Sequence, residues 1–443
     1  MNQIKNVYLS NISEDVWAFI DSLPAKVKQN EIEENAFLSD RALFTLEPNT
    51  LFISNKSISC QFLDYACSLI NLDPIEIVTP DSHEGRLSLQ IMNDQKLVDR
   101  LVHLGKQNGI NLRAYSSTTE FYQLAEFLNK KVKVNLPFSP TYNHRNTVDL
   151  FGSKGGIRGL VEKQPLSSGL KMAPGKIFTD KKEAINYASE LISASQGVVI
   201  KTNRGHAGMG IVIIPPGKID LNRKKEDQIE KLIGFDQYWD MFPVIVEKFI
   251  DVDPNIGGGF PNLEYLIMPD GDLNLLYSCG MRVTNGVFSG VEIGPEAISP
   301  IVLEKMLTIG NNLGILYSKA GYRGYFDIDF AAGRDGNLYI TESNLRQTGG
   351  SHVYHLAKQL LGSDYPNQTY LISDNTFKLP AGEWTLAKIF KILKPLLYSV
   401  AKKSGIVVVS ENMLARGQLS YVAIGKNRKD TNKLVSDMIS RLN

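Results

Sequence analysis

Residues 326–346 read FDIDFAAGRDGNLYITESNLR. This stretch decides the fold, because two apolar runs flank Asp335-Gly336, a dipeptide typical of tight β-hairpin turns. A two-residue turn at Asp335-Gly336 would pair Arg334 with Asn337, so that paired positions along the hairpin sum to 671. The sequence therefore predicts a hairpin whose register can be written residue by residue.

This register places acidic residues opposite one another. Asp329 falls opposite Glu342, and Asp327 falls opposite Asn344. All four share one face of the hairpin, because side chains alternate along a strand. Like charges directly opposite each other destabilise a sheet, so the pattern favours a cation between them. Oxygen ligands of this kind suit Mg²⁺ that is shared with phosphate oxygens; the alternative is a solvated hairpin face with unpaired acids.

The segment after this hairpin predicts a helix over about 351–361. Arg346 lies one strand step further along the acidic face, and Ser351 is the expected N-cap. A helix N-terminus is a ready site for an anion. His352 and His355 could form a metal pair, but no third ligand has a suitable spacing, so we interpret them as histidines on the polar face of the helix.

A glycine-rich segment occupies residues 197–214, GVVIKTNRGHAGMGIVII. Lys201 ends an apolar strand, and Gly205, Gly208 and Gly210 follow it. Glycines let backbone N–H groups approach phosphate closely, and a neighbouring lysine adds a point charge. A glycine-rich hairpin turn would look the same. The segment is neither a Walker A loop nor a kinase loop.

Glu247 lies inside an apolar strand, VIVEKFI at 244–250. A carboxylate in that position is costly unless it is paired. The edge of the strand could offer backbone groups to adenine while Glu247 accepts from an amino group. The alternative is a surface acid on an edge strand.

The size and charge of the chain exclude several classes of protein. The chain has 443 residues, which predicts about three domains. Its 48 basic and 47 acidic residues leave a formal net charge of +1, so no global field favours nucleic acid or an anionic membrane. Three cysteines cannot form a disulfide framework, and no apolar run approaches the ~20 residues of a membrane span. Without a signal-peptide pattern, we expect a cytoplasmic protein.

The two ends of the chain predict further α/β structure. Strands at 51–54 and 75–78 alternate with helices, which indicates a parallel sheet in the first third. The absence of G-x-G-x-x-G argues against a dinucleotide site there. After about residue 376, strands near 406–409 and 419–424 predict a small α/β unit.

Taken in order, these residues resemble the ATP-grasp superfamily, and the E-x-N-x-R run at 342–346 is the most specific element. The tail, with VVVSENMLARGQLSYVAIG at 407–425, resembles pheganomycin-type peptide ligases. The resemblance implies an α/β fold, α+β in the ATP-grasp part. It divides the chain into a pre-ATP-grasp parallel-sheet domain (1–145), an ATP-grasp domain (146–370, with a lid at about 176–250) and a C-terminal α/β extension (371–443).

The resemblance also implies a role for each matched position. The residues expected to contact ATP are Lys154, Lys201, Gly205, His206, Gly208, Gly210, Glu247, Phe249 and Asp253. One or two Mg²⁺ ions, for which Mn²⁺ could substitute, would be held by Asp329, Glu342 and Asn344. Arg282 and Arg346 would face the reacting carboxylate. His206 and Asp327 depart from the family's pattern, so their roles stay open.

The implied activity joins a carboxylate to an amine with ATP, through an acyl phosphate, and releases ADP and phosphate. The expected substrates are a small carboxylate such as an amino acid, and an amine or peptide; homodimers are common in this superfamily. Three alternatives remain: loading of an amino acid onto a carrier-protein thiol, phosphate transfer, and nucleotide binding without catalysis.

Overall fold

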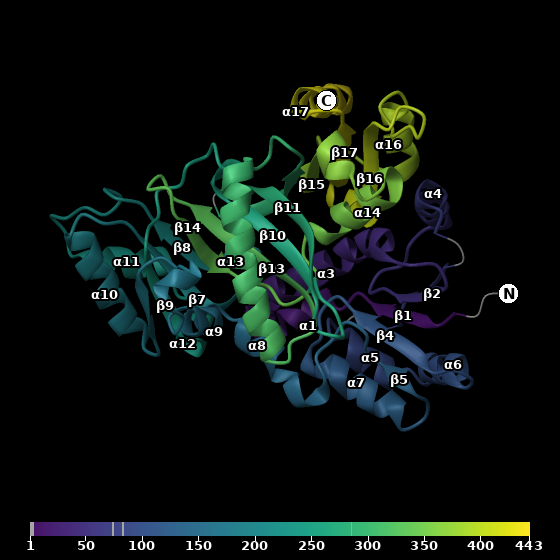
Figure 1. The fold of residues 1–443 in the computed structure, drawn as a ribbon, viewed down its shortest axis with the longest axis horizontal. Helices are drawn as coiled ribbons and strands as arrows, with labels where there is room; N and C mark the ends of the chain where they lie inside the picture. Colours follow the sequence, from purple (N-terminus) through teal and green to yellow (C-terminus); the bar gives the residue numbers. More distant parts are fainter. Residues whose placement is uncertain (1–3, 73–74, 82–83, 285) are drawn as a thin grey trace.

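The computed structural model describes residues 4–72, 75–81, 84–284 and 286–443, and these ranges contain three β-sheets (Figure 1). A parallel sheet carries the N-terminal part, an eight-stranded sheet runs through the middle, and a four-stranded sheet forms a separate layer at the left of Figure 1. This mixed α/β architecture with a parallel N-terminal sheet confirms the predicted fold class.

The N-terminal sheet has the strand order β3-β2-β1-β4-β5. Its strands are β1 (Asn6–Leu9), β2 (Thr50–Ile53), β3 (Ile75–Val78), β4 (Ile110–Ala114) and β5 (Val134–Asn135). Its helices are α1 (Ile12–Asp15), α2 (Trp17–Ile20), α3 (Ala25–Phe37), the 3₁₀ helix η1 (Leu38–Thr45), α4 (Cys60–Ile70), α5 (Leu87–Asn93), α6 (Gln95–Gly105) and α7 (Thr119–Asn129). Strand β2 is apolar from Leu51 to Ile53 because its alternating side chains enter two different cores: Phe52 packs toward the central sheet, whereas Leu51 and Ile53 pack in the N-terminal core.

The central sheet has the order β14-β13-β10-β11-β12-β15-β17-β16. Its strands are β10 (Pro261–Ile267), β11 (Leu273–Thr284), β12 (Val287–Ile293), β13 (Gly324–Ala332), β14 (Leu338–Glu342), β15 (Tyr370–Lys378), β16 (Gly405–Ser410) and β17 (Gln418–Gly425). Its helices are α13 (Pro300–Lys319), α14 (Ser351–Leu361), α15 (Tyr365–Gln368), α16 (Leu386–Leu393) and α17 (Arg428–Leu442). Strands β15 to β17 belong to the same sheet as β10 to β14, so the sheet runs across the domain boundary expected at residue 370.

The four-stranded sheet has the order β6-β9-β7-β8 and covers the region expected to form the lid. Its strands are β6 (Gly175–Phe178), β7 (Val198–His206), β8 (Met209–Ile214) and β9 (Val244–Lys248). The accompanying helices are α10 (Lys181–Ser193), α11 (Lys225–Ile233) and α12 (Tyr238–Met241), and α8 (Asn146–Phe151) and α9 (Lys154–Val161) precede the sheet. We refer to residues 175–248 as the lid.

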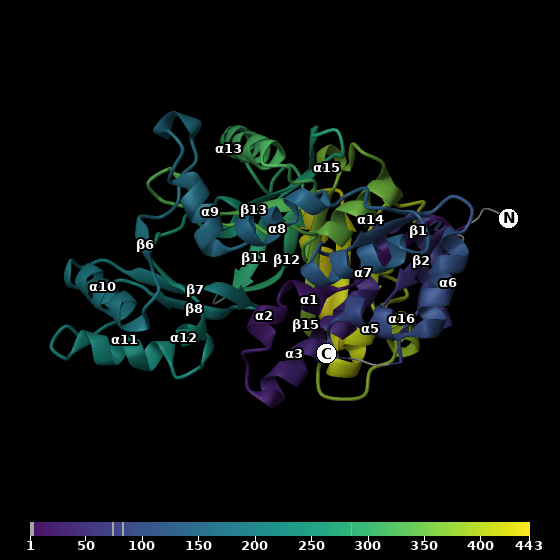
Figure 2. The same cartoon turned by 90° about the horizontal axis from the view of Figure 1, so that it is seen from below.

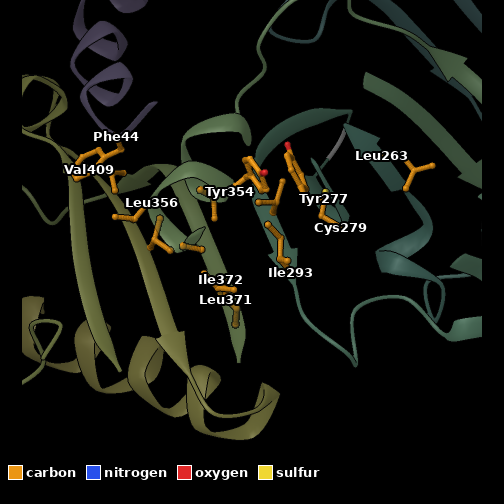
Figure 3. Close-up of a cluster of buried hydrophobic side chains, with 14 of the residues drawn as sticks. Phe44, Leu263, Tyr277, Cys279, Ile293, Tyr354, Leu356, Leu371, Ile372 and Val409 are labelled. Atoms are coloured by element: carbon orange, nitrogen blue, oxygen red, sulfur yellow. The ribbon is translucent and has the colours of Figure 1, made fainter. Parts of the chain in front are cut away.

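One hydrophobic core joins the N-terminal part to the central sheet. Phe44 of η1, Leu356 of α14 and Val409 of β16 belong to it, although they come from distant parts of the chain (Figure 3). All three side chains are buried. Through this continuous core, η1 packs against helix α14 of the central sheet.

The lid rests on the N-terminal part. Phe19 and Leu23 belong to the same hydrophobic core as the lid residues Tyr238 and Val246. The rings of Phe19 and Tyr238 lie 4.9 Å apart between centroids, and α2 lies beside β7 and β8 (Figure 2). The structure therefore has the lid docked against residues 17–23.

The acidic hairpin differs in its turn from the prediction. Ala332 pairs with Leu338, and the backbone N–H of Gly333 donates to the carbonyl of Asn337 at 2.9 Å, which leaves a three-residue turn at 334–336 with Gly336 at φ +79°. The two-residue turn at Asp335-Gly336 was therefore wrong, since Gly336 takes the left-handed position of a three-residue turn. A β-bulge between positions 329 and 330 shifts the register back by one residue.

Among the described residues, no helix is both long enough and apolar enough to cross a membrane.

Candidate active site

The acidic face of β13 and β14 forms as expected. Asp329 lies opposite Glu342 in the ladder. Asn262 of β10 lies opposite Asp329 on its other side, and its amide nitrogen donates to Asp329 Oδ1 at 2.6 Å and to Asp327 Oδ2 at 3.2 Å. Sequence analysis missed Asn262, because nothing in the sequence shows that β10 pairs with β13.

Asp327 and Asn344 form a second pair on the same hairpin. The backbone N–H and the side-chain amide of Asn344 both donate to Asp327 Oδ1, at 2.8 and 3.0 Å. Asp327 is thus held in place by its partner on the chain, and Asn344 keeps its side-chain oxygen for other partners. That oxygen accepts from Arg346 Nη2 at 3.1 Å.

Burial and mutual repulsion disturb the pKa values of these acids. Burial, followed by the charges of Asp327 and Glu342, raises the pKa of Asp329 well above its ordinary value. Burial is also the main cause that raises the pKa of Asp327 to about 6. Burial would raise the pKa of Glu342 as well, but the charge of Lys154 and its hydrogen bond bring that pKa below its usual range. The hairpin therefore concentrates more negative charge than its neighbours neutralise.

Two lysines reach this region from different elements. Lys154 begins α9, where Ser153 caps the helix, and its Nζ lies 3.1 Å from Glu342 Oε1. Lys201 of β7 lies 2.7 Å from Glu247 Oε2, and its Nζ also reaches the carbonyl of Thr341 at 3.5 Å. Both lysines are buried. The structure thus brings the two predicted phosphate-binding lysines to the end of β14.

Glu247 is buried in β9 and is fully paired. Its two carboxylate oxygens accept from Lys201 and from Arg158 Nη2, the latter at 2.5 Å. Burial alone would raise the pKa of Glu247, but the charges of Lys201 and Arg158 lower it. The alternative of a surface acid is wrong, because Glu247 is buried. Arg158 was missed, and its place in an apolar, glycine-containing helix was the available signal.

The glycine-rich segment is a tight hairpin in which β7 continues past Lys201 to His206. Ala207 and Gly208 form the two-residue turn at φ +51° and +83°. Gly205 lies beside Lys154, since a Cβ added at Gly205 would stand 3.8 Å from Lys154 Nζ. The hairpin therefore reaches over the lysine that contacts Glu342.

His206 lies at the interface between the lid and the N-terminal part. Its Nε2 is 3.6 Å from Glu31 Oε2 of α3. Burial, helped by the charge of Arg346, lowers the pKa of His206 to about 4. His206 is therefore neutral at pH 7, so it adds no charge to the interface between the lid and the N-terminal part.

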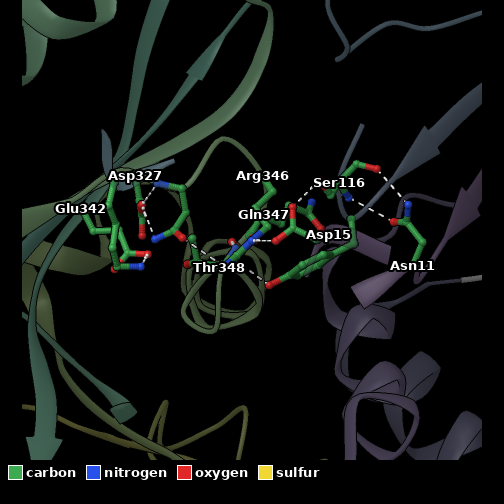
Figure 4. Close-up of polar contacts among 12 residues, drawn as sticks. Asn11, Asp15, Ser116, Asp327, Glu342, Arg346, Gln347 and Thr348 are labelled. Carbon is green, nitrogen blue, oxygen red and sulfur yellow. Dashed lines mark hydrogen bonds and ion pairs between the residues drawn. The ribbon is translucent and has the colours of Figure 1, made fainter. Parts of the chain in front are cut away.

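Arg346 connects the acidic hairpin to the N-terminal part (Figure 4). Its Nε donates to Asp15 Oδ2 at 2.5 Å, and its Nη1 donates to the hydroxyl of Tyr115 at 2.9 Å. Together with the bond to Asn344, these contacts fix the guanidinium plane. Asp15 and Tyr115 were missed, because both are more than 200 residues away in the sequence.

The other predicted residues are Arg282, Phe249 and Asp253, and their side chains make no hydrogen bond or ion pair with Asp329 or Glu342 among the described residues. Arg282 of β11 donates through Nη1 to the carbonyl of Ser373 at 2.9 Å and lies 3.4 Å from Asp374 Oδ2. The backbone N–H of Phe249 donates to the carbonyl of Gly197. Asp253 Oδ1 accepts from the backbone and side chain of Asn255. The backbone N–H of Asp253 also donates to the carbonyl of Ala332 in β13 at 2.8 Å, which places Asp253 beside the acidic hairpin, whereas these contacts of Arg282 and Phe249 do not involve that hairpin.

No group of three or more His, Cys, Asp or Glu side chains within the described ranges is arranged to hold a metal ion. The expected set contains only two such residues, Asp329 and Glu342, because its third member is the amide of Asn344. The metal assignment thus depends on two carboxylates and one amide oxygen, and it stays a prediction.

Comparison with known proteins gives no match among family models or curated sequences. Solved structures do match. Biotin carboxylase from Campylobacter jejuni, in complex with β-γ-ATP, aligns over 100% of this chain and 92% of its own, with a TM-score of 0.58 and 14% identity. N5-carboxyaminoimidazole synthetase from Staphylococcus aureus, complexed with ADP, aligns over 100% and 98%, with a TM-score of 0.55 and 12% identity.

A third match is the biotin carboxylase domain dimer of 2-oxoglutarate carboxylase from Hydrogenobacter thermophilus, in complex with MgADP, ADP and bicarbonate. It covers 96% of this chain and 87% of its own, with a TM-score of 0.53 and 13% identity. All three structures hold an adenine nucleotide. At these identities the comparison establishes the fold alone, and this chain shares the fold of these enzymes over nearly its whole length.

Proposed function

We propose that this protein is an ATP-dependent carboxylate–amine ligase that forms an amide or peptide bond. One observation carries the proposal. Lys154 Nζ donates to the carboxylate of Glu342, although the two residues are 188 positions apart in the sequence, and Glu342 lies directly opposite Asp329. A cation suited to phosphate and a pair of acids suited to a metal thus meet at one place. The fold shared with ATP- and ADP-bound enzymes supports the same interpretation.

The residues fit Mg-ATP. The acids Asp329 and Glu342 and the amide of Asn344 are oxygen donors of the kind that Mg²⁺ takes, and the excess negative charge of the hairpin suits a divalent cation. Mg²⁺ supplies charge neutralisation for the triphosphate when it is bound. Lys154 and Lys201 would neutralise phosphate oxygens, and the hairpin at 205–210 would cover them. Mn²⁺ has the same ligand preference and could replace Mg²⁺.

The proposed reaction has two steps. A carboxylate oxygen attacks the γ-phosphorus of ATP, the bond to the β-phosphate oxygen breaks, and ADP leaves. The amine nitrogen then attacks the acyl carbon, phosphate departs, and the amine loses a proton. Transfer of this kind depends on positioning and charge neutralisation. Arg346, held by Asp15 and Tyr115, would orient the carboxylate, with Arg282 as a second candidate, and the docked lid would keep water from the acyl phosphate.

The test uses hydroxylamine as a small amine. We expect the protein, given Mg-ATP, hydroxylamine and one carboxylate from a panel of amino acids and bicarbonate, to form the matching hydroxamate (N-hydroxycarbamate from bicarbonate) and one equivalent of ADP. Bicarbonate is included because one structural neighbour holds it. ADP formation without hydroxamate for every member of the panel, while phosphate appears on another acceptor, would contradict the ligase proposal and favour phosphate transfer.

A further inference from the structure

A small, partly open cavity lies between the N-terminal part and the beginning of α14. It has a volume of about 20 Å³, enough for one or two water molecules or for the head of a small anion. Its lining includes Arg41 of η1, Ser10, Tyr115, Gln347, Thr348 and His352. Two of these lining residues, Gln347 and Thr348, directly follow Arg346 in the sequence.

Arg41 is the unusual member of this lining, because it is buried without an acidic partner. Its residue is 8% exposed. Its Nε donates to the carbonyl of Leu38 at 3.2 Å; within the described part of the chain, its terminal nitrogens make no hydrogen bond and no carboxylate lies within 4 Å of them. A guanidinium carries five N–H donors, and a buried charge without a partner is strongly unfavourable.

The acids near Arg41 make their hydrogen bonds elsewhere, although Asp40 Oδ1 has no hydrogen-bond partner among the described residues. Asp40, next to it in sequence, accepts through Oδ2 from the backbone N–H groups of Glu411 and Asn412 at 2.9 and 3.0 Å. Glu34 is paired with Arg416. Burial lowers the pKa of Arg41, although the charges of Tyr115, Asp40 and Glu34 act in the opposite direction. Within the described residues, none of these groups forms a hydrogen bond or an ion pair with the guanidinium, so its terminal nitrogens are available to an anion.

The remaining polar groups around the cavity also lack partners or are held rigid. Ser10 Oγ and His352 Nε2 are buried and have no hydrogen-bond partner within the described ranges. Thr348 and Ser351, at the N-terminal end of the eleven-residue helix α14, donate their hydroxyls to Glu264 at 2.7 and 2.5 Å. A helix N-terminus adds partial positive charge. The surroundings thus favour a small anion.

This cavity shares a wall with the candidate active site. Tyr115 lines the cavity, and its hydroxyl accepts from Arg346 Nη1 at 2.9 Å. Gln347, the next residue, also lines the cavity and accepts from the hydroxyl of Tyr8 at 2.5 Å. A substrate whose anionic end occupied the cavity would therefore lie next to Arg346.

We propose that Arg41 binds the free carboxylate of the amine substrate. This inference rests on the ligase function proposed above, and it narrows the amine to an amino acid or a peptide with a free carboxylate. A planar carboxylate can accept two parallel N–H bonds from a guanidinium. The cavity holds the carboxylate head, and the amino group extends toward Arg346.

The first experiment needs no knowledge of the substrate. Thermal unfolding is followed while sodium acetate replaces sodium chloride at constant ionic strength, for the wild type, Arg41→Gln, Arg41→Lys and Arg113→Gln. Arg113 is the control, because its side chain is 10% exposed but paired with Glu47 at 3.2 Å. We expect acetate to raise the unfolding temperature saturably in the wild type and in Arg113→Gln, and its apparent affinity to fall about 30-fold in Arg41→Gln, the size expected for a lost charge-assisted pair.

The other outcomes contradict the proposal. No saturable effect of acetate on the wild type would mean that the cavity holds only water. An equal effect in Arg41→Gln would place the anion elsewhere, and stabilisation by inorganic phosphate but not by acetate would remove the carboxylate assignment. Arg41→Lys keeps the charge and loses the two-bond geometry, so we expect intermediate affinity.

A second experiment separates this inference from the ligase proposal. For an acceptor amino acid, KM is compared with that of its carboxamide. The wild type should prefer the free carboxylate about 30-fold, and Arg41→Gln should lose that preference. Equal KM values in the wild type, with hydroxamate still formed, would overturn the Arg41 inference and leave the ligase standing. Failure to form hydroxamate would instead overturn the ligase proposal, and acetate binding would still test the cavity.

Discussion

The acidic hairpin holds a half-buried carboxylate, Asp329, and the lid sheet holds a buried one, Glu247, and their surroundings act on the two in opposite ways. Asp329, on β13, faces Glu342 across the ladder, and among the described residues only Asn262 donates a hydrogen bond to its carboxylate. Glu247, on β9, has Lys201 on one oxygen and Arg158 on the other. The pKa of Asp329 is raised by burial and its acidic neighbours, whereas cations lower the pKa of Glu247 against the effect of burial.

This difference distinguishes a candidate ligand-binding site, the Asp329–Glu342 pair, from a structural cluster around Glu247. The Glu247 cluster is neutralised within the chain, so it can hold Lys201 in place whether or not a ligand is bound. The Asp329–Glu342 pair has an excess of negative charge, so it becomes favourable only when a cation arrives. The comparison predicts that changes to the hairpin alter activity, while changes to the lid cluster alter stability.

The largest effect is expected at the hairpin. Glu342→Ala should lower turnover at least about 10³-fold, because it removes a carboxylate expected to act on the transition-state charge, while the fold stays intact. Turnover is measured as ADP release, and circular dichroism checks the fold. Unchanged turnover in a folded variant would remove the metal assignment of Glu342.

The second-largest effect is a loss of stability, expected for the Glu247 cluster in the lid. Arg158→Met should lower the free energy of unfolding by about 3 kcal/mol, because it leaves Glu247 buried with one cation instead of two. Urea unfolding measures it. Arg204→Met is the control: Arg204 pairs with Asp149, whose side chain is 64% exposed, and such surface pairs contribute at most about 1 kcal/mol. Equal losses in the two variants would show that the buried cluster has no special role.

Glu14 extends the comparison to an acid that has hydrogen bonds but no cation. It accepts from Asn11 and Thr118 at 2.8 and 2.9 Å, and burial raises its pKa to about 7. The folded protein therefore binds more protons than the unfolded chain between pH ~4.5 and ~7, so this contribution to stability is lost as pH rises through that window. The slope is at most about 1.4 kcal/mol per pH unit.

Replacing Glu14 with Gln should flatten this part of the stability profile, measured by urea unfolding from pH 4.5 to 8. Glu247 contributes a pH dependence of stability that has the opposite sign. Because its pKa is lowered in the folded protein, its contribution is present above pH ~4.5 and is lost as pH falls below that value. A Glu14→Gln profile parallel to that of the wild type would show that Glu14 does not retain its proton on folding.

The smallest effect is expected for Asp329→Asn without divalent ions. At pH 8 the substitution should raise the free energy of unfolding by up to about 1 kcal/mol, because the folded wild type must either keep Asp329 protonated or place its charge directly opposite Glu342, and Asn can still accept from Asn262. Mg-ATP should then stabilise the wild type but not the variant. Destabilisation of the variant without Mg²⁺ would contradict the view that this pair is unfavourable when empty.

The sequence predicted the opposed acids for a reason that was partly wrong. The assumed two-residue turn shifted the register by one position, and the unforeseen bulge between positions 329 and 330 shifted it back. Asp329 therefore meets Glu342 as predicted. A second correction concerns Ser351, which begins α14 rather than capping it, and His352, which is buried rather than on a polar face.

Other parts of the site could not be predicted because they depend on contacts between distant elements. Asp15 and Tyr115 reach Arg346 only because the N-terminal sheet packs against the hairpin. Asn262 becomes a neighbour of Asp329 only once β10 pairs with β13. The local motifs could be predicted from the sequence, since turns, glycines and apolar runs act within a few residues. The distant residues that position these motifs could not be predicted.

The account's central claim is that the β13–β14 hairpin holds a divalent cation together with ATP. The most direct measurement is electron paramagnetic resonance of Mn²⁺, titrated with a non-hydrolysable ATP analogue into the wild type and into the Asp329→Asn/Glu342→Gln variant. We expect one or two ions to bind the wild-type complex and the variant to lose them at least about 100-fold in affinity. Equal Mn²⁺ binding in both proteins would contradict the claim.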